Sequence, residues 1–415
     1  MEKYNGSEDL LEWLWSNFRR FGSLYKASLY GSEAWVVSDP RLVQYILRDN
    51  WQNYKKGQAI KRIEFLLGKG LMVSEGELWR QQRKMIQPLF HHEVVSSLVA
   101  VIVGANAKLV DKWEQAAREN QTVNVTSDVS EMVLETVLRS IFGANYETAK
   151  EPFSVLSSVT ARNLQFAHTF RALGSIIGQI IAERKQKKAS GSDFLGMLMA
   201  ARDHESGEAM PNRQLIWETL TLVVAGYETT ASALNWTWYL LSQNAEAEKK
   251  LSMELSGEKE LNYSIGELSH FTYSRQVLEE AMRLYPPGWL LTSRAIKDDQ
   301  IDGHLLPAGT EVYISPYLIH RNPAVWQDPD IFNPDRFGPE RSKDRHPFSV
   351  LPFSAGPRKC IGEMFARVEM QIHLIMVAKR MHLRCSQCEP IEIEAGVNLR
   401  SKSDFIMQPV MNSDF

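Results

Sequence analysis

Hydrophobic residues recur at helical spacing almost throughout the stretch between residues 75 and 283. The most apolar part, Leu215–Leu241, contains Glu218, Glu228 and Asn235, which are expensive side chains to expose to lipid. A helix that is apolar nearly all round and does not cross a membrane is buried at the centre of a protein. The sequence therefore predicts a mostly helical body around one central helix, with no membrane span.

Clusters of Gly, Ser, Asn and Glu at residues 143–145, 189–192 and 205–208 divide the helical region. The predicted helices are Glu77–Phe90, His92–Glu119, Ser127–Phe142, Pro152–Gln165, Phe170–Lys187, Asp193–Arg202, Leu215–Leu241, Ala245–Leu255, Tyr273–Leu284 and Gly362–Met381. Most of the chain between residues 75 and 381 is therefore expected to be helical.

Short strands are predicted near both ends of the chain. The first two are Ser23–Leu29 and Ala34–Ser38, and Asp39-Pro40 then begins a helix with Asp39 as its N-cap. Short strands and turns follow between residues 286 and 348, and again after residue 385. We expect a mainly α fold with small β-sheets and one domain, 1–415. Its β-rich portion would comprise approximately 22–50 and 286–350 with 385–415, and its helical portion approximately 75–285 and 362–381.

Charge and cysteine content exclude several classes of protein. The formal net charge is −3, so no overall field favours nucleic acid or an anionic membrane surface. The three cysteines are too few for a disulfide framework, and no signal peptide is recognisable at the start; both features favour a reducing, cytoplasmic location. Cys385 and Cys388 form a single CxxC without a second pair, so a zinc or redox role is not expected.

The third cysteine stands in the strongest local pattern, Phe353-Ser-Ala-Gly356-Pro-Arg358-Lys-Cys360-Ile-Gly362. A cysteine directly before a helix has backbone N–H groups and the helix dipole near its sulfur, and both stabilise a thiolate. The two glycines permit a tight loop that a flat cofactor could approach, and Arg358 could pair with an anionic group of that cofactor.

This segment resembles the haem-ligand loop of the cytochrome P-450 superfamily. The resemblance covers the chain from about residue 22 to its end and implies a haem b (iron protoporphyrin IX) with Cys360 as axial thiolate. The haem would lie between the central helix and the helix after Cys360. Glu280 and Arg283 match the family's Glu-x-x-Arg pair, and Arg336 would be its third, structural partner.

The central helix carries Ala225-Gly226-Tyr-Glu228-Thr229-Thr, which is similar to the family's oxygen-activation groove. An acid and a hydroxyl inside a buried helix are costly unless they are paired or functional. Activation of dioxygen in a water-poor pocket needs protons, which a hydroxyl backed by a carboxylate can supply. The resemblance gives Thr229 and Glu228 these catalytic roles, and Gly226 is expected to leave room for dioxygen. Taken without Cys360, a kinked Ser/Thr-rich core helix is the simpler interpretation.

The resemblance also implies residues that bind the haem propionates and the substrate. Trp79 and Arg83 match the family's Trp-x-x-x-Arg helix, and Arg294 would be a second propionate partner. The residues expected to line the substrate pocket are Ile60, Phe65, Leu66, Leu222, Ala225, Trp289, Leu290, Leu291 and Thr292. Trp289 is bulky enough to narrow the space over the haem.

The implied activity is hydroxylation or epoxidation of an apolar or amphipathic small molecule with dioxygen, in bacterial secondary, lipid or terpenoid metabolism. Because no GxGxxG or Walker-type loop is present, the electrons would come from a separate ferredoxin or flavodoxin. Cations that could form its docking surface are Arg80, Lys84, Lys359 and Arg367. The region between residues 143 and 211 is short, which suggests an open entrance or a substrate delivered by a carrier protein.

Two other functions remain open at this point. The first is a peroxide-driven peroxygenase or decarboxylase, in which a substrate carboxylate would replace Glu228 and Thr229; the intact pair disfavours it. The second is a non-catalytic haem-thiolate sensor, which would have no use for a proton relay.

Overall fold

The computed structural model describes residues 2–6, 9–158, 165–188, 191–257, 261–385 and 391–412. They belong to two compact units. The first comprises Met1–Arg62, Gln276–Cys360 and Ile391–Lys402, and the second Ile63–Arg275, Ile361–Pro390 and Ser403–Phe415. The chain passes from one unit to the other within helix α3 (Gln58–Leu67), and again directly after Cys360. The single domain expected from the sequence stays a prediction.

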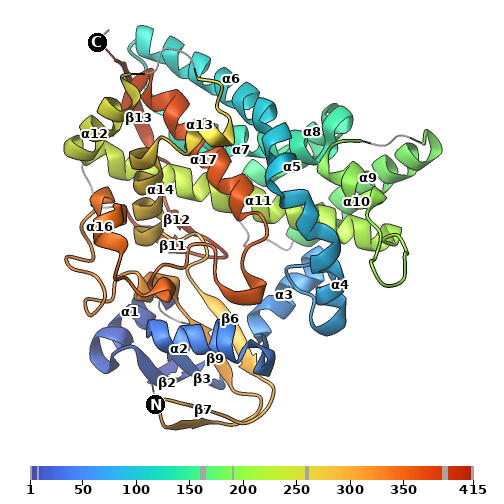
Figure 1. Ribbon diagram of the computed structural model, residues 1–415, viewed down its shortest axis with the longest axis vertical. Coiled ribbons are helices and arrows are strands. Elements are labelled where there is room, and N and C mark those ends of the chain that lie inside the picture. The colour runs from blue at the N-terminus through green and yellow to red at the C-terminus, as the bar shows by residue number, and fades with distance from the viewer. Residues whose placement is uncertain are drawn as a thin grey trace. The chain divides into compact units, whose positions relative to one another are not determined.

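A six-stranded sheet organises the first unit (Figure 1). Across the sheet, its strands are β1 (Glu2–Tyr4), β2 (Leu24–Leu29), β3 (Ser32–Val37), β9 (Glu311–Ile314), β6 (Leu291–Ala295) and β4 (Tyr54–Lys56). Two-stranded sheets are formed by β7 (Asp299–Ile301) with β8 (His304–Leu306) and by β11 (Ile393–Ala395) with β12 (Leu399–Ser401). The helices of this unit are α1 (Leu10–Phe21), α2 (Pro40–Gln44), α15 (Pro316–Ile319), α16 (Pro339–Ser342) and most of α14 (Thr272–Leu284).

The first two predicted strands are confirmed as β2 and β3. Leu29 pairs with Ser32, so Tyr30 and Gly31 form a two-residue hairpin turn, and both have positive φ, as that turn requires. Asp39 caps α2 by accepting a hydrogen bond from the Arg41 N–H at 2.8 Å, as predicted.

Helix α1 was not expected from the sequence, and its apolar face contributes to a hydrophobic core of this unit. Leu14, Ala27 and Val36 are fully buried there. Trp289 belongs to the same core, where its indole N–H donates to the carbonyl of Gly396 at 3.0 Å. The ring of Trp289 thus packs in a core of this unit, and that it narrows the substrate space stays a prediction.

The second unit is helical. Its helices are α4 (Gly76–Ile86), α5 (His92–Ser97), α6 (Val99–Arg118), α7 (Val125–Phe142), α8 (Tyr146–Ser158), α9 (Gln165–Gln186), α10 (Phe194–Ala200), α11 (Asn212–Ser242), α12 (Ala245–Leu255), α13 (Ile265–Leu268) and α17 (Glu363–Ala378). Its one sheet among the described residues joins β10 (Met381–Cys385), β13 (Ile406–Met411) and β5 (Val123–Asn124), in that order.

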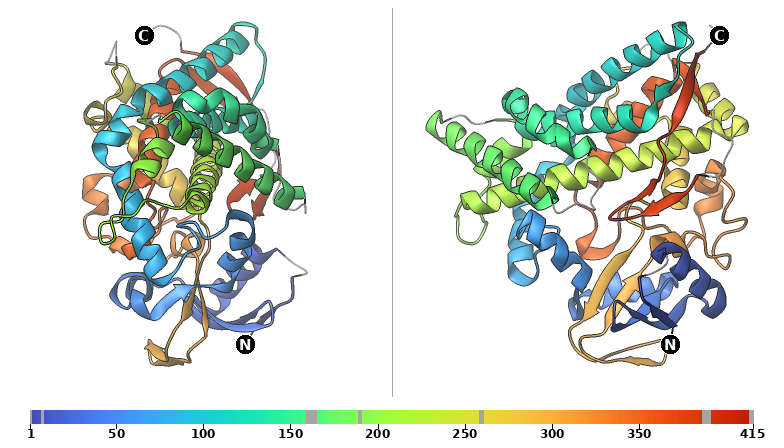
Figure 2. Two further views of the ribbon diagram at one scale, coloured as in Figure 1. Left: turned by 90° about the vertical axis from the view of Figure 1, so that its right-hand side faces the viewer. Right: turned by 180° about the vertical axis from the view of Figure 1, so that it is seen from behind.

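Helix α11 is the central helix predicted from the sequence. It packs against α7 and α9, and Figure 2 shows it extending beneath α6 and α7 along the length of this unit. In its second half Leu234, Trp236 and Leu241 are buried. Among the described residues no helix is long and apolar enough to cross a membrane.

The helix boundaries differ from the prediction where proline or sheet pairing intervenes. Helix α8 begins at Tyr146 and contains Pro152, although the sequence predicts a helix that starts at this proline. Helix α17 ends at Ala378 instead of Met381, because Met381 pairs with Met411 at the start of β10.

Candidate active site

The cysteine loop belongs to the first unit up to Cys360. The backbone N–H of Cys360 donates to the carbonyl of Phe353 at 2.9 Å, which closes the loop, and residues 356–358 form a single 3₁₀ turn. Cys360 is exposed, and α17 begins three residues later at Glu363. Because its backbone is fixed and a helix N-terminus follows, this thiol is suited to act as a thiolate ligand.

The two glycines of this loop have different reasons for being glycine. Gly356 has a φ of 73°, and a Cβ at this position would lie 1.9 Å from the carbonyl oxygen of Leu47 in the short π-helix Tyr45–Asp49. A Cβ at Gly362 would lie 3.7 Å from the ring of Phe90, an ordinary contact. The loop therefore needs Gly356 for close packing against the backbone behind it. That a flat cofactor approaches the loop stays a prediction.

A Gly356→Ala substitution is expected to displace the cysteine loop and to lower the free energy of unfolding by roughly 3 kcal/mol or more, because steric overlap and a left-handed φ add up. Gly362→Ala is the matched control in the same loop and should change stability by less than about 1 kcal/mol. Guanidinium unfolding of both variants tests this expectation. Equal destabilisation by the two substitutions would contradict it.

A buried ion triad lies in the same unit. Arg283 donates from Nε and Nη2 to the two carboxylate oxygens of Glu280 at 2.6 and 2.8 Å, and both side chains are fully buried. Arg336 Nε approaches Glu280 Oε1 at 3.3 Å. Arg283 Nη1 also donates to the carbonyls of His320 and Pro329. The three residues predicted as a structural triad thus bind together and tie α14 to the segment between residues 320 and 336.

His320 connects this triad to the cysteine loop. Its Nε2 accepts a hydrogen bond from the Leu351 N–H at 2.8 Å, so its Nδ1 carries the proton and donates to the carbonyl of Arg283 at 3.1 Å. Burial, followed by the positive charge of Arg283, lowers the pKa of His320 to about 3. The neutral imidazole therefore joins α14 to the residues just before Phe353.

The predicted proton-relay residues lie on α11 in the second unit. Thr229 donates its hydroxyl hydrogen to the carbonyl of Ala225 at 2.7 Å. Ala225 is exposed on a helix that is otherwise mostly buried, and Glu228 and Thr229 are partly exposed. A Cβ at Gly226 would lie 3.4 Å from Val137 of α7. This is an ordinary van der Waals distance, so packing against α7 does not require a glycine here. That Gly226 leaves room for dioxygen stays a prediction.

The predicted propionate partners are divided between the two units. Trp79 and Arg83 lie one turn apart on the same face of α4, where Trp79 is buried and Arg83 Nε donates to Gln87 at 3.3 Å. Arg294 lies on β6 and donates to the carbonyl of Gly309 at 2.8 Å, with Glu311 at 3.6 Å. Arg294 is therefore already held by a carboxylate of its own unit.

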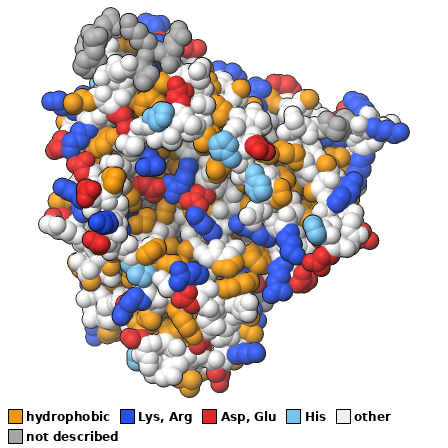
Figure 3. Space-filling view, viewed as in Figure 1, with side chains coloured by type: hydrophobic (Ala, Val, Ile, Leu, Met, Phe, Trp, Pro, Cys, Tyr) orange, Lys and Arg blue, Asp and Glu red, His pale blue; other side chains and the backbone are white. Residues whose placement is uncertain are grey.

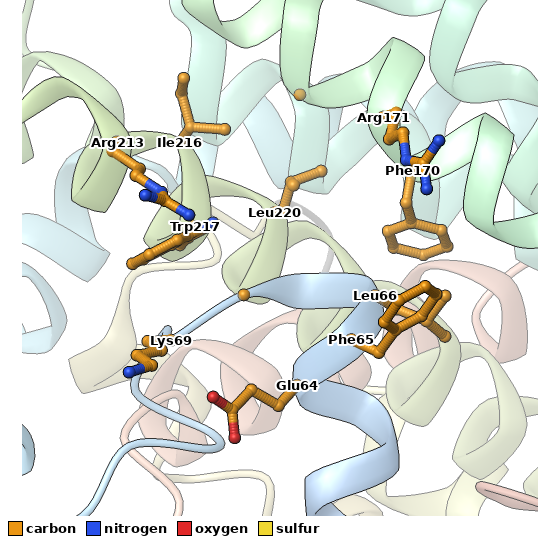
Figure 4. A pocket seen from close by; sticks show the side chains of 12 residues that line it. Glu64, Phe65, Leu66, Lys69, Phe170, Arg171, Arg213, Ile216, Trp217 and Leu220 are labelled. Carbon is orange, nitrogen blue, oxygen red and sulfur yellow. The ribbon is translucent and has the colours of Figure 1, made fainter.

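A cavity of about 430 Å³ lies in the second unit between α3, α9 and α11 (Figure 4). Of the residues predicted to line a pocket, Phe65 and Leu66 line this cavity, and the other seven do not. The cavity also has residues that were not predicted, among them Lys69, Phe170, Arg171, Arg213 and Trp217. The sequence held two signals for them. Phe170 and Arg171 are adjacent, and Arg213 and Trp217 are four residues apart, so each pair places a cation beside an aromatic ring.

The donor set fits a haem. Cys360 offers one exposed thiol on a fixed loop, Ala225 is an exposed small residue on α11, and Trp79 and Arg83 carry N–H donors of a kind that binds carboxylates. No group of three or more His, Cys, Asp or Glu side chains that could hold a bare metal ion occurs among the described residues. Cys385 ends β10, and Cys388 lies outside the described residues.

Comparisons with known proteins agree with these features. A family model described as Cytochrome P450 matches residues 2–177 and 163–407. Cyclooctatin synthase of Streptomyces melanosporofaciens is 31% identical over 389 residues, which cover 88% of this chain and 83% of that protein. Cytochrome P450 4B1 of Homo sapiens is 32% identical over 380 residues, which cover 82% of this chain and 74% of that protein.

A solved structure shows that the fold is shared as well. The crystal structure of the cytochrome P450DA heme domain has a TM-score of 0.87 at 22% identity, and the match covers 98% of this chain and 93% of that chain. The chain therefore belongs to the cytochrome P450 family and is a monooxygenase that carries haem b on an axial cysteine thiolate.

Proposed function

We propose that this monooxygenase hydroxylates or epoxidises an apolar or amphipathic small organic molecule, using dioxygen and electrons from a separate ferredoxin or flavodoxin. The cavity beside α11 supports such a substrate, because Leu66, Phe170 and Leu220 give it an apolar interior. One relative is named cyclooctat-9-en-7-ol 5-monooxygenase and comes from Streptomyces melanosporofaciens. It supports a role in bacterial lipid or terpenoid metabolism.

In this proposal Cys360 is the axial ligand, and Trp79, Arg83, Arg294 and Arg358 hold the haem carboxylates. When bound, the haem supplies the activation of dioxygen, and the thiolate favours cleavage of the O–O bond. Phe353 would fix the position of the thiolate through its carbonyl, which accepts from the Cys360 N–H at 2.9 Å, and Gly362 would stand beside the haem as the residue before α17. Arg294 Nε lies 3.6 Å from Glu311 Oε1, which is a loose ion pair. Arg294 would therefore give up part of this contact to bind a haem carboxylate.

Thr229 and Glu228 would deliver protons on the substrate side. Because the Thr229 hydrogen points to the carbonyl of Ala225, the lone pairs of Oγ1 are free to accept a hydrogen bond from water or from a protonated group. Glu228, next along the helix and partly exposed, can bring a proton from solvent to this hydroxyl. The pair next to the exposed Ala225 is the observation that carries the proposal, since a sensor would not need it.

A Thr229→Ala variant is expected to keep consuming oxygen while releasing most of the electrons as hydrogen peroxide, with product per oxygen falling roughly tenfold or more, as for loss of an acid–base group. Thr237→Ala is a matched control. Thr237 lies about two turns further along α11 and makes the same kind of hydrogen bond, to the carbonyl of Ala233 at 2.7 Å. Simultaneous assays of oxygen, peroxide and product test this expectation. Unchanged coupling in Thr229→Ala would contradict the assigned role.

The redox partner would be recognised on an exposed face, but the cations expected there are largely neutralised. Arg80 pairs with Glu77 at 3.1 Å, Lys84 with Glu205 at 2.9 Å, and Arg367 with Glu363 at 3.0 Å. Figure 3 shows basic and acidic side chains together over α4. A separate, cytoplasmic electron donor remains part of the proposal. Lys359, which directly precedes Cys360 in the sequence, is the proposed docking cation nearest to the haem ligand.

A further inference from the structure

The cavity between α3, α9 and α11 combines an apolar interior with a cationic rim. Phe170 and Leu220 are almost fully buried in it, whereas Lys69, Arg171 and Arg213 are exposed. One carboxylate, Glu64, also lines the cavity. A volume of about 430 Å³ is in the usual range for a small-molecule site, so the cavity can hold an extended organic ligand.

The rim cations differ from most other basic residues of this unit. Lys187 pairs with Glu183 and Arg118 with Glu114, as surface cations on helices commonly do. For Lys69, Arg171 and Arg213, no carboxylate lies within ion-pair distance among the residues that the structure describes. The rim therefore keeps positive charge that is available to a ligand.

Lys69 stands on a loop whose backbone is fixed. Its carbonyl accepts hydrogen bonds from the side-chain amides of Gln82 at 2.8 Å and Gln214 at 3.2 Å. Two residues later the Leu71 N–H donates to the buried carboxylate of Glu218 at 2.8 Å. On the other side, a Cβ at Gly68 would lie 2.0 Å from Nε1 of Trp217. The loop thus packs directly against α11, and the position of Lys69 is set before any ligand binds.

Arg213 is held in place by an aromatic side chain. Its guanidinium lies 4.6 Å from the ring centroid of Trp217, one turn further along α11. Figure 4 shows Arg213, Trp217 and Lys69 on one side of the cavity, with Phe170, Leu66 and Phe65 on the opposite side. Arg171 lies beside Phe170, so that side also carries one cation, whereas Lys69 and Arg213 share the other side with Trp217. The second side therefore suits the anionic end of a ligand whose apolar part lies against Leu66 and Phe170.

We propose that the substrate of this monooxygenase is an amphipathic carboxylic acid, whose carboxylate is bound by Lys69 and Arg213 at the rim while its apolar part lies against Leu66 and Phe170. This inference rests on the proposed function and names the substrate class for it. An ammonium group would meet like charges at the rim, and a neutral alcohol would gain no charge-assisted hydrogen bond there. An acidic carrier protein that presents an acyl thioester is the competing occupant.

Binding of matched ligands to the haem-containing enzyme tests the proposal. Dodecanoate, 1-dodecanol and dodecyltrimethylammonium share one apolar chain and differ only in the end group. Titration calorimetry at low salt is expected to give dodecanoate about tenfold tighter binding than 1-dodecanol, and the ammonium the weakest. Salt should weaken the binding of dodecanoate and leave that of the alcohol nearly unchanged.

Single substitutions locate the carboxylate site. Lys69→Gln and Arg213→Gln should each weaken the binding of dodecanoate and leave the affinity for 1-dodecanol unchanged. The expected loss is only about fivefold, because solvent partly screens both cations. Glu64→Gln should tighten the binding of dodecanoate about twofold, since it removes the carboxylate among the residues that line the cavity. Lys187→Gln, on the same unit but outside the cavity, is the control and should change neither ligand.

The outcomes separate this inference from the proposed function. Equal affinities for the acid and the alcohol would overturn the carboxylate site, and so would equal losses of affinity for both ligands in Lys69→Gln and Arg213→Gln. Either result would leave the proposal of an apolar substrate standing. Binding of an acyl chain only as a carrier-protein thioester would overturn it as well. Absence of binding by all three amphiphiles would count against the proposed substrate class itself.

Discussion

An Arg283→Met substitution is expected to prevent accumulation of folded, haem-containing enzyme. It would leave the fully buried Glu280 carboxylate without its bidentate partner, and the carbonyls of His320 and Pro329 without their donor. Loss of one partner of a buried ion pair costs roughly 3–5 kcal/mol, and each unsatisfied carbonyl adds about 1–3 kcal/mol. Because a folded protein is stable by only about 5–15 kcal/mol, this one substitution removes most of its stability.

The measurement is the yield of soluble protein and its haem content per chain. Arg41→Met is the matched control in the same unit, because Arg41 pairs with Asp39 at 3.0 Å while its side chain is 76% exposed. It should behave like the unmodified enzyme. A second variant, Glu280→Gln, keeps the shape of the carboxyl group but removes its charge, and it should retain part of the haem content. Normal haem content in Arg283→Met would show that the triad does not support the cysteine loop.

The sequence predicted those parts of the fold that repeat a local pattern. The hydrophobic period located α7, α11 and α12 to within about three residues, because packing in a helical unit follows that period directly. Helix α1 was missed although Asp9 caps it and Leu11, Leu14 and Phe18 lie at helical spacing, so its signal was present in the sequence. The predicted end of α17 was too late. Met381 belongs to β10 because it pairs with Met411 of β13, which is distant in sequence.

The candidate site divides in the same way. Motif residues such as Cys360, Glu280 and Arg283 could be chosen from sequence, because their spacing along the chain is fixed. The reason for Gly356 could not, since it depends on the carbonyl of Leu47, which is more than three hundred residues away in sequence. Lys69 and Arg213 share a cavity only because Gly68 packs against Trp217. Such long-range contacts leave no periodic trace in a single sequence.

The stability of the enzyme is expected to fall as the pH drops below about 6.5, because two histidines are buried in the neutral form. In the second unit His373 accepts a hydrogen bond from the indole of Trp238 at 2.8 Å and lies 2.7 Å from Oδ1 of Asn106. Burial lowers the pKa of His373 to about 3, as it does that of His320. Below pH 6.5 the unfolded chain binds two protons that the folded chain does not.

Each of these protons lowers the free energy of unfolding by about 1.4 kcal/mol per pH unit, until the pH approaches the folded pKa. His373→Gln should therefore remove about 1.4 kcal/mol per pH unit from the acid slope, whatever its effect on stability at neutral pH. His91→Gln, at an exposed position, is the control and should leave the slope unchanged. Guanidinium unfolding between pH 5 and 6.5 measures both slopes. An unaltered slope in His373→Gln would contradict the burial of a neutral imidazole.

A buried acid acts in the opposite direction at higher pH. Burial raises the pKa of Glu369 on α17 well above its ordinary value, with the hydroxyl of Thr136 on α7 opposing this. Above about pH 4.5 the unfolded chain releases this proton and the folded chain keeps it, so stability falls as the pH rises.

Between pH 4.5 and 6.5 the two histidines act against Glu369, and above pH 6.5 they no longer contribute, so buried carboxyl groups decide the trend. The half-buried Glu254, whose pKa is also raised by burial, acts in the same direction as Glu369. Stability is therefore expected to be greatest near pH 6.5. Glu369→Gln should flatten the decline on the alkaline side, whereas Glu131→Gln, at an exposed position on α7, should not. A decline that persists unchanged in Glu369→Gln would show that this carboxyl group is ionised inside the folded protein.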